Sequence, residues 1–261
     1  MKRKVEICVI SDVHLGFVGC RAKELVKYLR SIDPDILILN GDIIDIWQFR
    51  TYYFPSSHSR VLQRIFKYVS DGKKVYYLTG NHDELLRKYS GLHLGNFVLD
   101  DKLVLELDGK KHWFFHGDIF DVSIRGSKWL AKLGSTGYEL LILLNKLVNF
   151  FLDLLGREKS SFSQRIKRAT KRGVKKLKDY ERTAAEIAIE NGYDVVVNGH
   201  SHMPGIKEIV TEKGSVTYLN SGDWVENLTA LEYCKGEWKI VYYKDLTFTE
   251  DWLKVENSDL P

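Results

Sequence analysis

The chain has 261 residues, of which 44% are hydrophobic and 28% are charged. This composition is typical of a folded globular protein rather than of a disordered or fibrous one. Its three cysteines are too few for a disulfide framework, which favours a reducing compartment. The formal net charge of +4 is small, so any strongly charged surface has to come from how the charges are distributed along the chain.

The N-terminal part of the chain reads as strands alternating with helices. Apolar runs at residues 5–10, 36–39 and 74–78 predict buried strands. Apolar residues at helical spacing predict helices at residues 22–30 and 60–69. Because strands and helices alternate, we expect a sheet covered by helices.

The pattern changes beyond this region. Residues 102–107 and 111–116 predict two strands, and an Asp-Gly pair between them is typical of a hairpin turn. A long helical region is expected from about residue 128 to residue 191. A strand at residues 194–198 and several short strands between residues 205 and 243 complete the prediction.

Five short polar motifs each follow a predicted strand directly. In open α/β sheets ligands bind beyond the carboxyl ends of the strands, so we expect the five motifs to meet at one site. Each motif alone could be an ordinary turn, because Asn, Asp and Gly dominate turns. Their joint occurrence after strands predicts a function. The motifs are Asp12-Val13-His14, Gly41-Asp42-Ile43-Ile44-Asp45, Gly80-Asn81-His82-Asp83, His116-Gly117-Asp118 and Gly199-His200-Ser201-His202.

The side chains of these motifs offer carboxylate, amide and imidazole ligands but no thiolate. Such donors suit Mn, Fe or Zn better than a metal that prefers sulfur. Two cations about 3.5–4 Å apart stabilise both the attacking and the leaving oxygen when phosphorus is attacked in line. A two-metal centre built from these motifs would therefore suit displacement at phosphorus.

These motifs, which span residues 12–202, resemble those of the calcineurin-like metallophosphoesterases. The resemblance implies an α/β (α+β) fold, namely a four-layer αββα sandwich with a dinuclear metal site. Residues 1–121 and 192–250 would form the catalytic core. Residues 122–191 would form a helical insertion, or cap, for substrate or membrane.

The resemblance also assigns roles to single residues. His82 matches the histidine that protonates the leaving group or stabilises charge on the phosphate. Two divalent ions are implied, of which the first would be held by Asp12, His14, Asp42 and His202, and the second by Asp42, Asn81, His116 and His200. Four further carboxylates are expected to orient the ligand histidines or to bind loops. They are Asp45, Asp83, Asp118 and Asp121.

The insertion begins with an apolar segment at residues 138–155. Charged and amide side chains interrupt it, so it lacks the uncharged stretch of about 18 residues that a membrane span needs. A helix that is apolar on most sides has to be covered, either by the protein core or by lipid. Both interpretations stay open.

Residues 157–182 are strongly basic. This segment contains eleven Lys and Arg residues and three acidic residues, so its net charge is +8, and the rest of the chain has a net charge of −4. A solvated face, a phosphate clamp and a lipid-headgroup face all fit this pattern. The basic face has no aromatic residues for stacking bases, which disfavours nucleic acid. The expected diphosphate contacts are Arg125, Arg168, Lys171, Arg172 and Lys175.

Further motifs resemble the UDP-2,3-diacylglucosamine diphosphatase family over residues 5–243. They are Gly41–Trp47, His116–Asp121, Lys128–Ala131 and Asn220–Glu226. The resemblance implies Mn²⁺-dependent hydrolysis of this anionic lipid-linked nucleotide to UMP and 2,3-diacylglucosamine 1-phosphate in lipid A biosynthesis. It also implies a cytoplasmic enzyme bound peripherally to the inner membrane of a Gram-negative bacterium. His82 stands where the well-known branch has arginine, so the chain is closer to the second, paralogous branch.

Two other functions stay open at this point. One is a metallophosphoesterase that acts on a nucleotide, a phosphoprotein or a nucleic-acid phosphodiester. The other is a non-catalytic module that binds the membrane surface, which the complete set of seven ligand positions disfavours. The oligomeric state is left unassigned.

Overall fold

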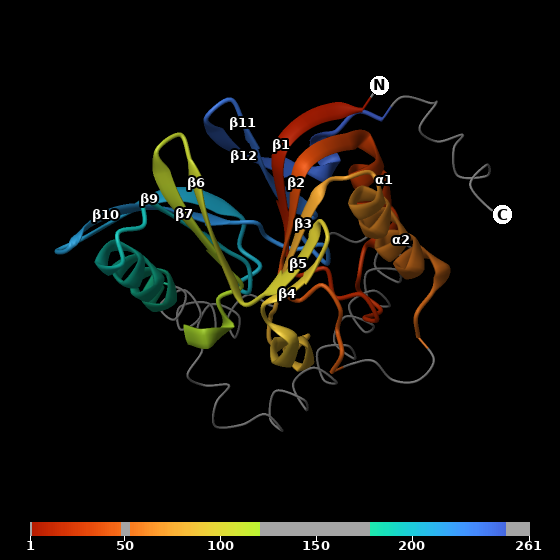
Figure 1. Ribbon diagram of the computed structural model, residues 1–261, viewed down its shortest axis with the longest axis horizontal. Helices are drawn as coiled ribbons and strands as arrows, with labels where there is room; N and C mark the ends of the chain where they lie inside the picture. The colour runs from red at the N-terminus through yellow and green to blue at the C-terminus, as the bar shows by residue number, and fades with distance from the viewer. Residues whose placement is uncertain (1, 48–52, 121–177, 249–261) are drawn as a thin grey trace, which may run out of the picture. The chain divides into compact units, whose positions relative to one another are not determined.

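The computed structural model describes residues 2–47, 53–120 and 178–248 (Figure 1). The chain divides into two compact units. One unit consists of Met1–Asp118 and Ala185–Pro261, and the other of Ile119–Ala184. Most of the second unit lies outside the described residues, so the fold below is that of the first unit.

A seven-stranded sheet forms the first layer of strands, in the order β12-β11-β1-β2-β3-β5-β4. Strands β1, β2, β3 and β5 run parallel, whereas β4, β11 and β12 run antiparallel to their neighbours. The strands are β1 (Arg3–Ile10), β2 (Ile32–Asn40), β3 (Lys74–Leu78), β4 (Leu92–Leu94), β5 (Phe97–Asp100), β11 (Thr229–Cys234) and β12 (Glu237–Tyr242).

A five-stranded sheet forms the second layer, in the order β6-β7-β8-β10-β9. Its strands are β6 (Lys102–Leu107), β7 (Lys110–Phe115), β8 (Val195–Asn198), β9 (Gly205–Thr211) and β10 (Gly214–Asn220). The hairpin of β6 and β7 turns through Asp108 and Gly109, whose φ angles are 51° and 74°. Two consecutive positive φ angles define the tight turn that an Asp-Gly pair favours, so the predicted hairpin is confirmed.

Helices flank the two sheets. Helices α1 (Ala22–Ser31) and α2 (Ser56–Ser70) pack through buried residues such as Leu25, Leu29 and Val61 into a core that they share with the first sheet. The helix at residues 178–190 ends beside the turn between β9 and β10, where Lys213 pairs with Glu190. The layers therefore follow the order helix, sheet, sheet, helix, which confirms the expected four-layer α/β sandwich.

The core between the two sheets explains the continuous apolar runs of the sequence. Ile7 and Val9 of β1 pack against the second sheet, whereas Cys8 and Ile10 face the core shared with α1 and α2. A parallel strand that is covered on both faces needs apolar side chains at successive positions. Among the described residues, no helix is both long and apolar enough to cross a membrane.

Three short elements were not predicted from the sequence. They are the 3₁₀ helix η1 (Glu84–Tyr89) and the strands β4 and β5. Two further 3₁₀ turns lie at η2 (Asp118–Phe120) and η3 (Tyr243–Asp245). Helix α2 begins at Ser56, earlier than its apolar periodicity indicates, because its first turn consists of polar residues.

Candidate metal centre

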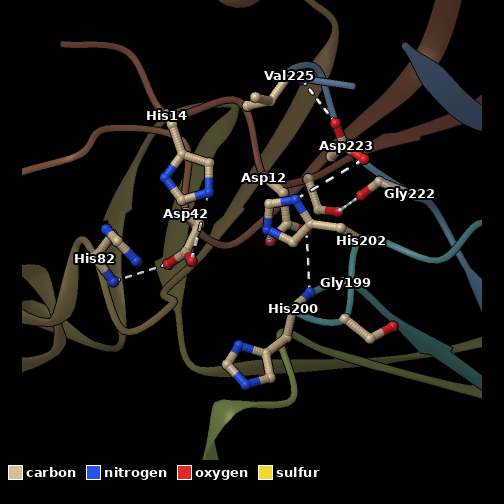
Figure 2. A network of polar contacts seen from close by, with 12 residues as sticks. Asp12, His14, Asp42, His82, Gly199, His200, His202, Gly222, Asp223 and Val225 are labelled. Carbon is tan, nitrogen blue, oxygen red and sulfur yellow. Dashed lines mark hydrogen bonds and ion pairs between the residues drawn. The ribbon is translucent and has the colours of Figure 1, made fainter. Parts of the chain in front are cut away.

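The five motifs lie at the carboxyl ends of β1, β2, β3, β7 and β8, where they meet as predicted. Backbone hydrogen bonds join the turns that carry them. The Asp12 amide donates to the carbonyl of Gly41 at 3.1 Å, and the Gly199 amide donates to that of His116 at 3.0 Å. Figure 2 shows the side chains gathered there, which include Asp12, His14, Asp42, His82, His200 and His202.

One group of candidate ligands comes from the turns after β1 and β8. Asp12, His14 and His202 each place one ligand atom so that all three lie within 4.8 Å of one another. Nε2 of His202 lies 3.1 Å from Oδ1 of Asp12. These residues are three of the four that were expected to hold the first metal.

A second group comes from the turns after β2, β7 and β8. Asp42, His116 and His200 also bring one ligand atom each within 4.8 Å of one another. Oδ2 of Asp42 lies 3.2 Å from Nε2 of His116 and 3.9 Å from Nε2 of His14. One carboxylate oxygen thus lies near a histidine of each group, which is where a carboxylate shared by two cations has to be.

Two of the expected ligand atoms, Nε2 of His14 and Oδ1 of Asn81, are buried without a hydrogen-bond partner among the described residues. Oδ1 of Asp12 and Nε2 of His116 are also buried, and each has only the ion-pair contact given above. A buried polar atom that makes no hydrogen bond costs about 1–3 kcal/mol. Divalent cations bind through these same atoms, so the donor set fits a pair of such ions.

Left-handed backbone geometry is concentrated in the same turns. It costs of order 1–3 kcal/mol in residues other than glycine and clusters at functional sites. The rest of the fold therefore holds these turns in a strained geometry, as a functional site requires. The residues concerned have φ angles between 51° and 62° and are Asp12, His14, Asp42, His200 and His202.

Two of the histidines are oriented by a hydrogen bond at Nδ1, and a third has a carboxylate near Nδ1, which leaves Nε2 of each for a metal. Nδ1 of His14 lies 3.2 Å from Oδ2 of Asp45, and Nδ1 of His116 lies 3.0 Å from the carbonyl oxygen of Asn40. Nδ1 of His202 lies 3.8 Å from a carboxylate oxygen of Asp223 (Figure 2).

Asp83 joins two of the turns rather than binding at the centre. Its carboxylate accepts hydrogen bonds from the amide of Ile43 at 3.0 Å, the amide of Gly80 at 2.5 Å and the hydroxyl of Tyr77 at 2.7 Å. Asp118 similarly accepts a hydrogen bond from Arg87 at 2.6 Å. Both carboxylates have the loop-binding role that was expected of them.

Two supporting residues were missed in the sequence. Asp223 accepts hydrogen bonds from the amides of Val225 and Glu226 at 2.7 and 2.5 Å, which fixes the carboxylate beside His202. Its motif was noted only for its resemblance to a family. Arg87 also donates to the hydroxyl of Thr79 at 3.2 Å, and nothing in the sequence around it indicated this role.

Within each group, the carboxylate is stabilised in its charged form by the histidines beside it. Burial raises the pKa of Asp12, but its contact with His202 and the nearby His116 together lower it to about 2. Burial likewise lowers the pKa of His202, but Asp12, together with Asp223 and Asp42, raises it to about 9. Burial also raises the pKa of Asp42, yet His116, together with His82 and His14, brings it well below its usual value. Both carboxylates are therefore anionic at neutral pH and ready to bind cations.

His82 lies beside the two groups and can act as an acid. Oδ1 of Asp45 lies 3.0 Å from Nδ1 of His82, whose side chain is 19% exposed. Burial lowers the pKa of His82, but Asp45 and Asp42 together raise it above its usual value. The ring centroids of His82 and Trp47 are 4.7 Å apart.

The expected substrate contacts lie outside the described residues. They are Arg125, Arg168, Lys171, Arg172 and Lys175. Asp121 and the apolar segment at residues 138–155 lie outside them as well.

Comparisons with known proteins agree with this geometry. The family model "Calcineurin-like phosphoesterase" matches residues 5–204. A UDP-2,3-diacylglucosamine hydrolase of Stenotrophomonas maltophilia is 24% identical over 248 residues, which are 88% of this chain and 96% of the relative. An enzyme of the same name from Vibrio cholerae is 26% identical, over 87% of this chain and 93% of the relative.

Solved structures also align with the chain. A phosphoesterase from E. coli, Yfce, has a TM-score of 0.46 and 12% identity, over 92% of this chain and 94% of the other. The family match covers every turn that carries a candidate ligand, since these turns lie between residues 12 and 202. The chain therefore belongs to the calcineurin-like phosphoesterases, a family of hydrolases that use divalent metal ions.

Proposed function

We propose that this protein is a two-metal hydrolase that cleaves the diphosphate bond of UDP-2,3-diacylglucosamine. The products would be UMP and 2,3-diacylglucosamine 1-phosphate. The observation that carries the chemistry is the position of Asp42, whose Oδ2 lies near His14 of one ligand group and His116 of the other. The relatives' names and the basic segment at residues 157–182 support the choice of substrate.

The proposed first metal is held by Asp12, His14, Asp42 and His202, and the second by Asp42, Asn81, His116 and His200. The donor set suits Mn²⁺, with Fe or Zn as other candidates, because it combines carboxylate, amide and imidazole ligands. When bound, the two cations would lower the pKa of a water molecule and stabilise negative charge on the phosphoryl oxygens.

Asp45 and His82 would position a metal ligand and supply a proton. Asp45 contacts both His14 and His82, so it would hold a metal ligand and the proposed proton donor in a fixed relation. His82 would give its proton to the leaving oxygen or bind a phosphoryl oxygen. Its raised pKa favours the protonated form that either role requires.

The substrate carries two acyl chains and a diphosphate. We infer that the basic segment binds the diphosphate, through residues among Arg125, Arg168, Lys171, Arg172 and Lys175. The apolar segment before it would cover acyl chains or face lipid. On this proposal the protein acts at the cytoplasmic face of an inner membrane, as a peripheral enzyme.

A substrate panel tests the proposal. Purified protein with Mn²⁺ is given UDP-2,3-diacylglucosamine dispersed in detergent, bis-p-nitrophenyl phosphate and single-stranded DNA. We expect release of UMP from the lipid and loss of that release when the metal is chelated. If UDP-2,3-diacylglucosamine stays intact while another substrate is hydrolysed, the proposed substrate is wrong but the phosphoesterase activity stands. Liposome binding without metal-dependent hydrolysis of any substrate would contradict the proposal that the protein is an enzyme.

A further inference from the structure

A buried histidine outside the candidate metal centre holds the turn that carries two of its ligands. His58, in the first turn of α2, is only 2% exposed. Its ring contacts Tyr53 and Phe54 edge to face, with centroids 5.8 and 5.4 Å away. Nδ1 of this ring accepts a buried hydrogen bond of 2.9 Å from the amide of Gly16.

The hydrogen bonds of the turn after β1 show why this contact matters. The amides of residues 12–15 donate to carbonyl oxygens of residues 41–43 at 2.9–3.1 Å. The amide of residue 17 donates to the carbonyl of His14 at 3.0 Å. Within this run the Gly16 amide has a side-chain acceptor, His58, instead of a carbonyl. The turn is therefore bound to the β2 turn by its backbone and to α2 through one imidazole.

The turn needs such support because its backbone is strained. Asp12, His14 and Gly16 have φ angles of 51°, 54° and 104°, all in the region that favours glycine. A buried amide that loses its acceptor is unfavourable, so without His58 the turn would shift until Gly16 found another partner. Such a shift would move His14, which lies two residues away along the chain.

The chemistry of His58 agrees with a permanent acceptor. A backbone amide can only donate, so Nδ1 has to be unprotonated and the ring proton has to be on Nε2. Burial lowers the pKa of His58 below its usual value, and the first turn of a helix disfavours a cation. The neutral imidazole is thus the form that fits this position.

We propose that His58 is a positioning residue for the metal centre, which holds the turn of Asp12 and His14 by accepting the Gly16 amide at Nδ1. The inference rests on the proposed two-metal site but not on the proposed substrate. It concerns one of the two ligand groups, because Asp12 and His14 both belong to the group of His202.

Two variants of nearly equal shape separate the hydrogen bond from packing. His58→Asn keeps an acceptor near the position of Nδ1, whereas His58→Leu has none, and both lose the ring contacts. Mn²⁺ is titrated into each metal-free protein by calorimetry. Loss of an outer partner of a metal ligand typically weakens binding about 10- to 100-fold, so we expect such a rise in Kd for one of the two ions in the Leu variant, while the Asn variant stays within about threefold of wild type. Equal Kd values in the two variants would overturn the proposal.

Measurements on the wild type test the same hydrogen bond even if a variant misfolds. In the ¹⁵N-labelled metal-free protein, we expect a His58 Nδ1 shift typical of an unprotonated nitrogen and slow hydrogen exchange at the Gly16 amide. A protonated Nδ1 would contradict the proposal. If the wild type binds fewer than two ions, the proposed metal site itself is wrong. That result is distinct from equal Kd values in the two His58 variants, which would overturn only the role of His58.

Discussion

The ligand atoms and the backbone of the candidate centre point to the same function by independent routes. Nε2 of His14 is buried without a hydrogen-bond partner among the described residues. The backbone of the same residue has a left-handed φ angle of 54°. Either feature costs free energy in the folded chain, and a bound cation can offset the first. Their coincidence in one residue is difficult to explain without a ligand.

Asp42 is the residue whose loss should be most damaging. The substitution Asp42→Asn keeps the shape but removes the charge that would be shared by both ions. A metal centre contributes several kcal/mol to transition-state stabilisation, so we expect kcat/KM to fall by about three orders of magnitude or more. The measurement is steady-state hydrolysis of bis-p-nitrophenyl phosphate with Mn²⁺.

Asp35→Asn is the matched control for this experiment. Asp35 lies in β2, the strand before the Asp42 turn, and pairs with Lys4 at 2.7 Å, but its side chain is 53% exposed and lies toward the opposite end of β2. We expect kcat/KM to be unchanged. If Asp42→Asn retained activity close to that of Asp35→Asn, the bridging role of Asp42 would be wrong.

Asp45 should influence the pH dependence through His82. Against the effect of burial, contact with Asp45 raises the pKa of His82, so Asp45→Asn should lower that pKa. If protonated His82 is the active form, the alkaline limb of the kcat/KM profile should then move to lower pH. The rate at the optimum should also fall, by about 10- to 100-fold, because His14 loses its orienting partner. An alkaline limb that does not move would argue against His82 as the proton donor.

At the scale of elements, the carboxyl ends of the strands determine which parts of the site could be predicted. Parallel strands deliver their following residues to one edge, so the meeting of the five motifs could be foreseen from strand order and spacing. The role of Asp223 could not, because it depends on the parallel pairing of β10 with β8, which brings the turn after β10 beside His202. The strands β4 and β5 were missed because both are short and lack a clear alternation of apolar residues.

Tight packing between the turns should make one glycine essential. An ideal Cβ at Gly80 would clash with the backbone nitrogen and the carboxylate of Asp42. Gly80→Ala should therefore displace the β3 turn and raise the Kd of Mn²⁺ at least as much as loss of an orienting residue does, about 10-fold or more. Calorimetric titration of the metal-free variant measures this.

Gly205→Ala provides the comparison, because a Cβ at Gly205 would meet a single neighbouring atom at 3.9 Å, an ordinary contact. This variant should bind Mn²⁺ as the wild type does. Equal binding by the two alanine variants would mean that the β3 turn tolerates displacement and that the close packing has no role in metal binding.

For the whole molecule, the distribution of charge is more informative than its total. The segment at residues 157–182 has a net charge of +8, while the remaining residues sum to −4. The sequence predicts this asymmetry fully, because it depends on composition alone. Where the basic side chains lie could not be predicted, because a charged helix face fits solvent, phosphate and lipid equally well.

Neutralising part of this segment should affect the lipid substrate selectively. In a variant with Arg168, Lys171, Arg172 and Lys175 replaced by Gln, we expect the KM for UDP-2,3-diacylglucosamine to rise by about tenfold or more, because each charge-assisted hydrogen bond to phosphate contributes about 1.5–3 kcal/mol. Hydrolysis of bis-p-nitrophenyl phosphate should be unchanged. Equal losses on both substrates would contradict a role in substrate binding.

The presence of two cations at the ends of β1, β2, β3, β7 and β8 is the central claim, and a crystal structure of the Mn²⁺-loaded protein tests it most directly. Anomalous diffraction recorded at the Mn absorption edge should give two peaks about 3.5–4 Å apart. One peak should be coordinated by Asp12, His14 and His202, the other by Asn81, His116 and His200, with Asp42 between them. A single peak, or two peaks held by other residues, would contradict the account.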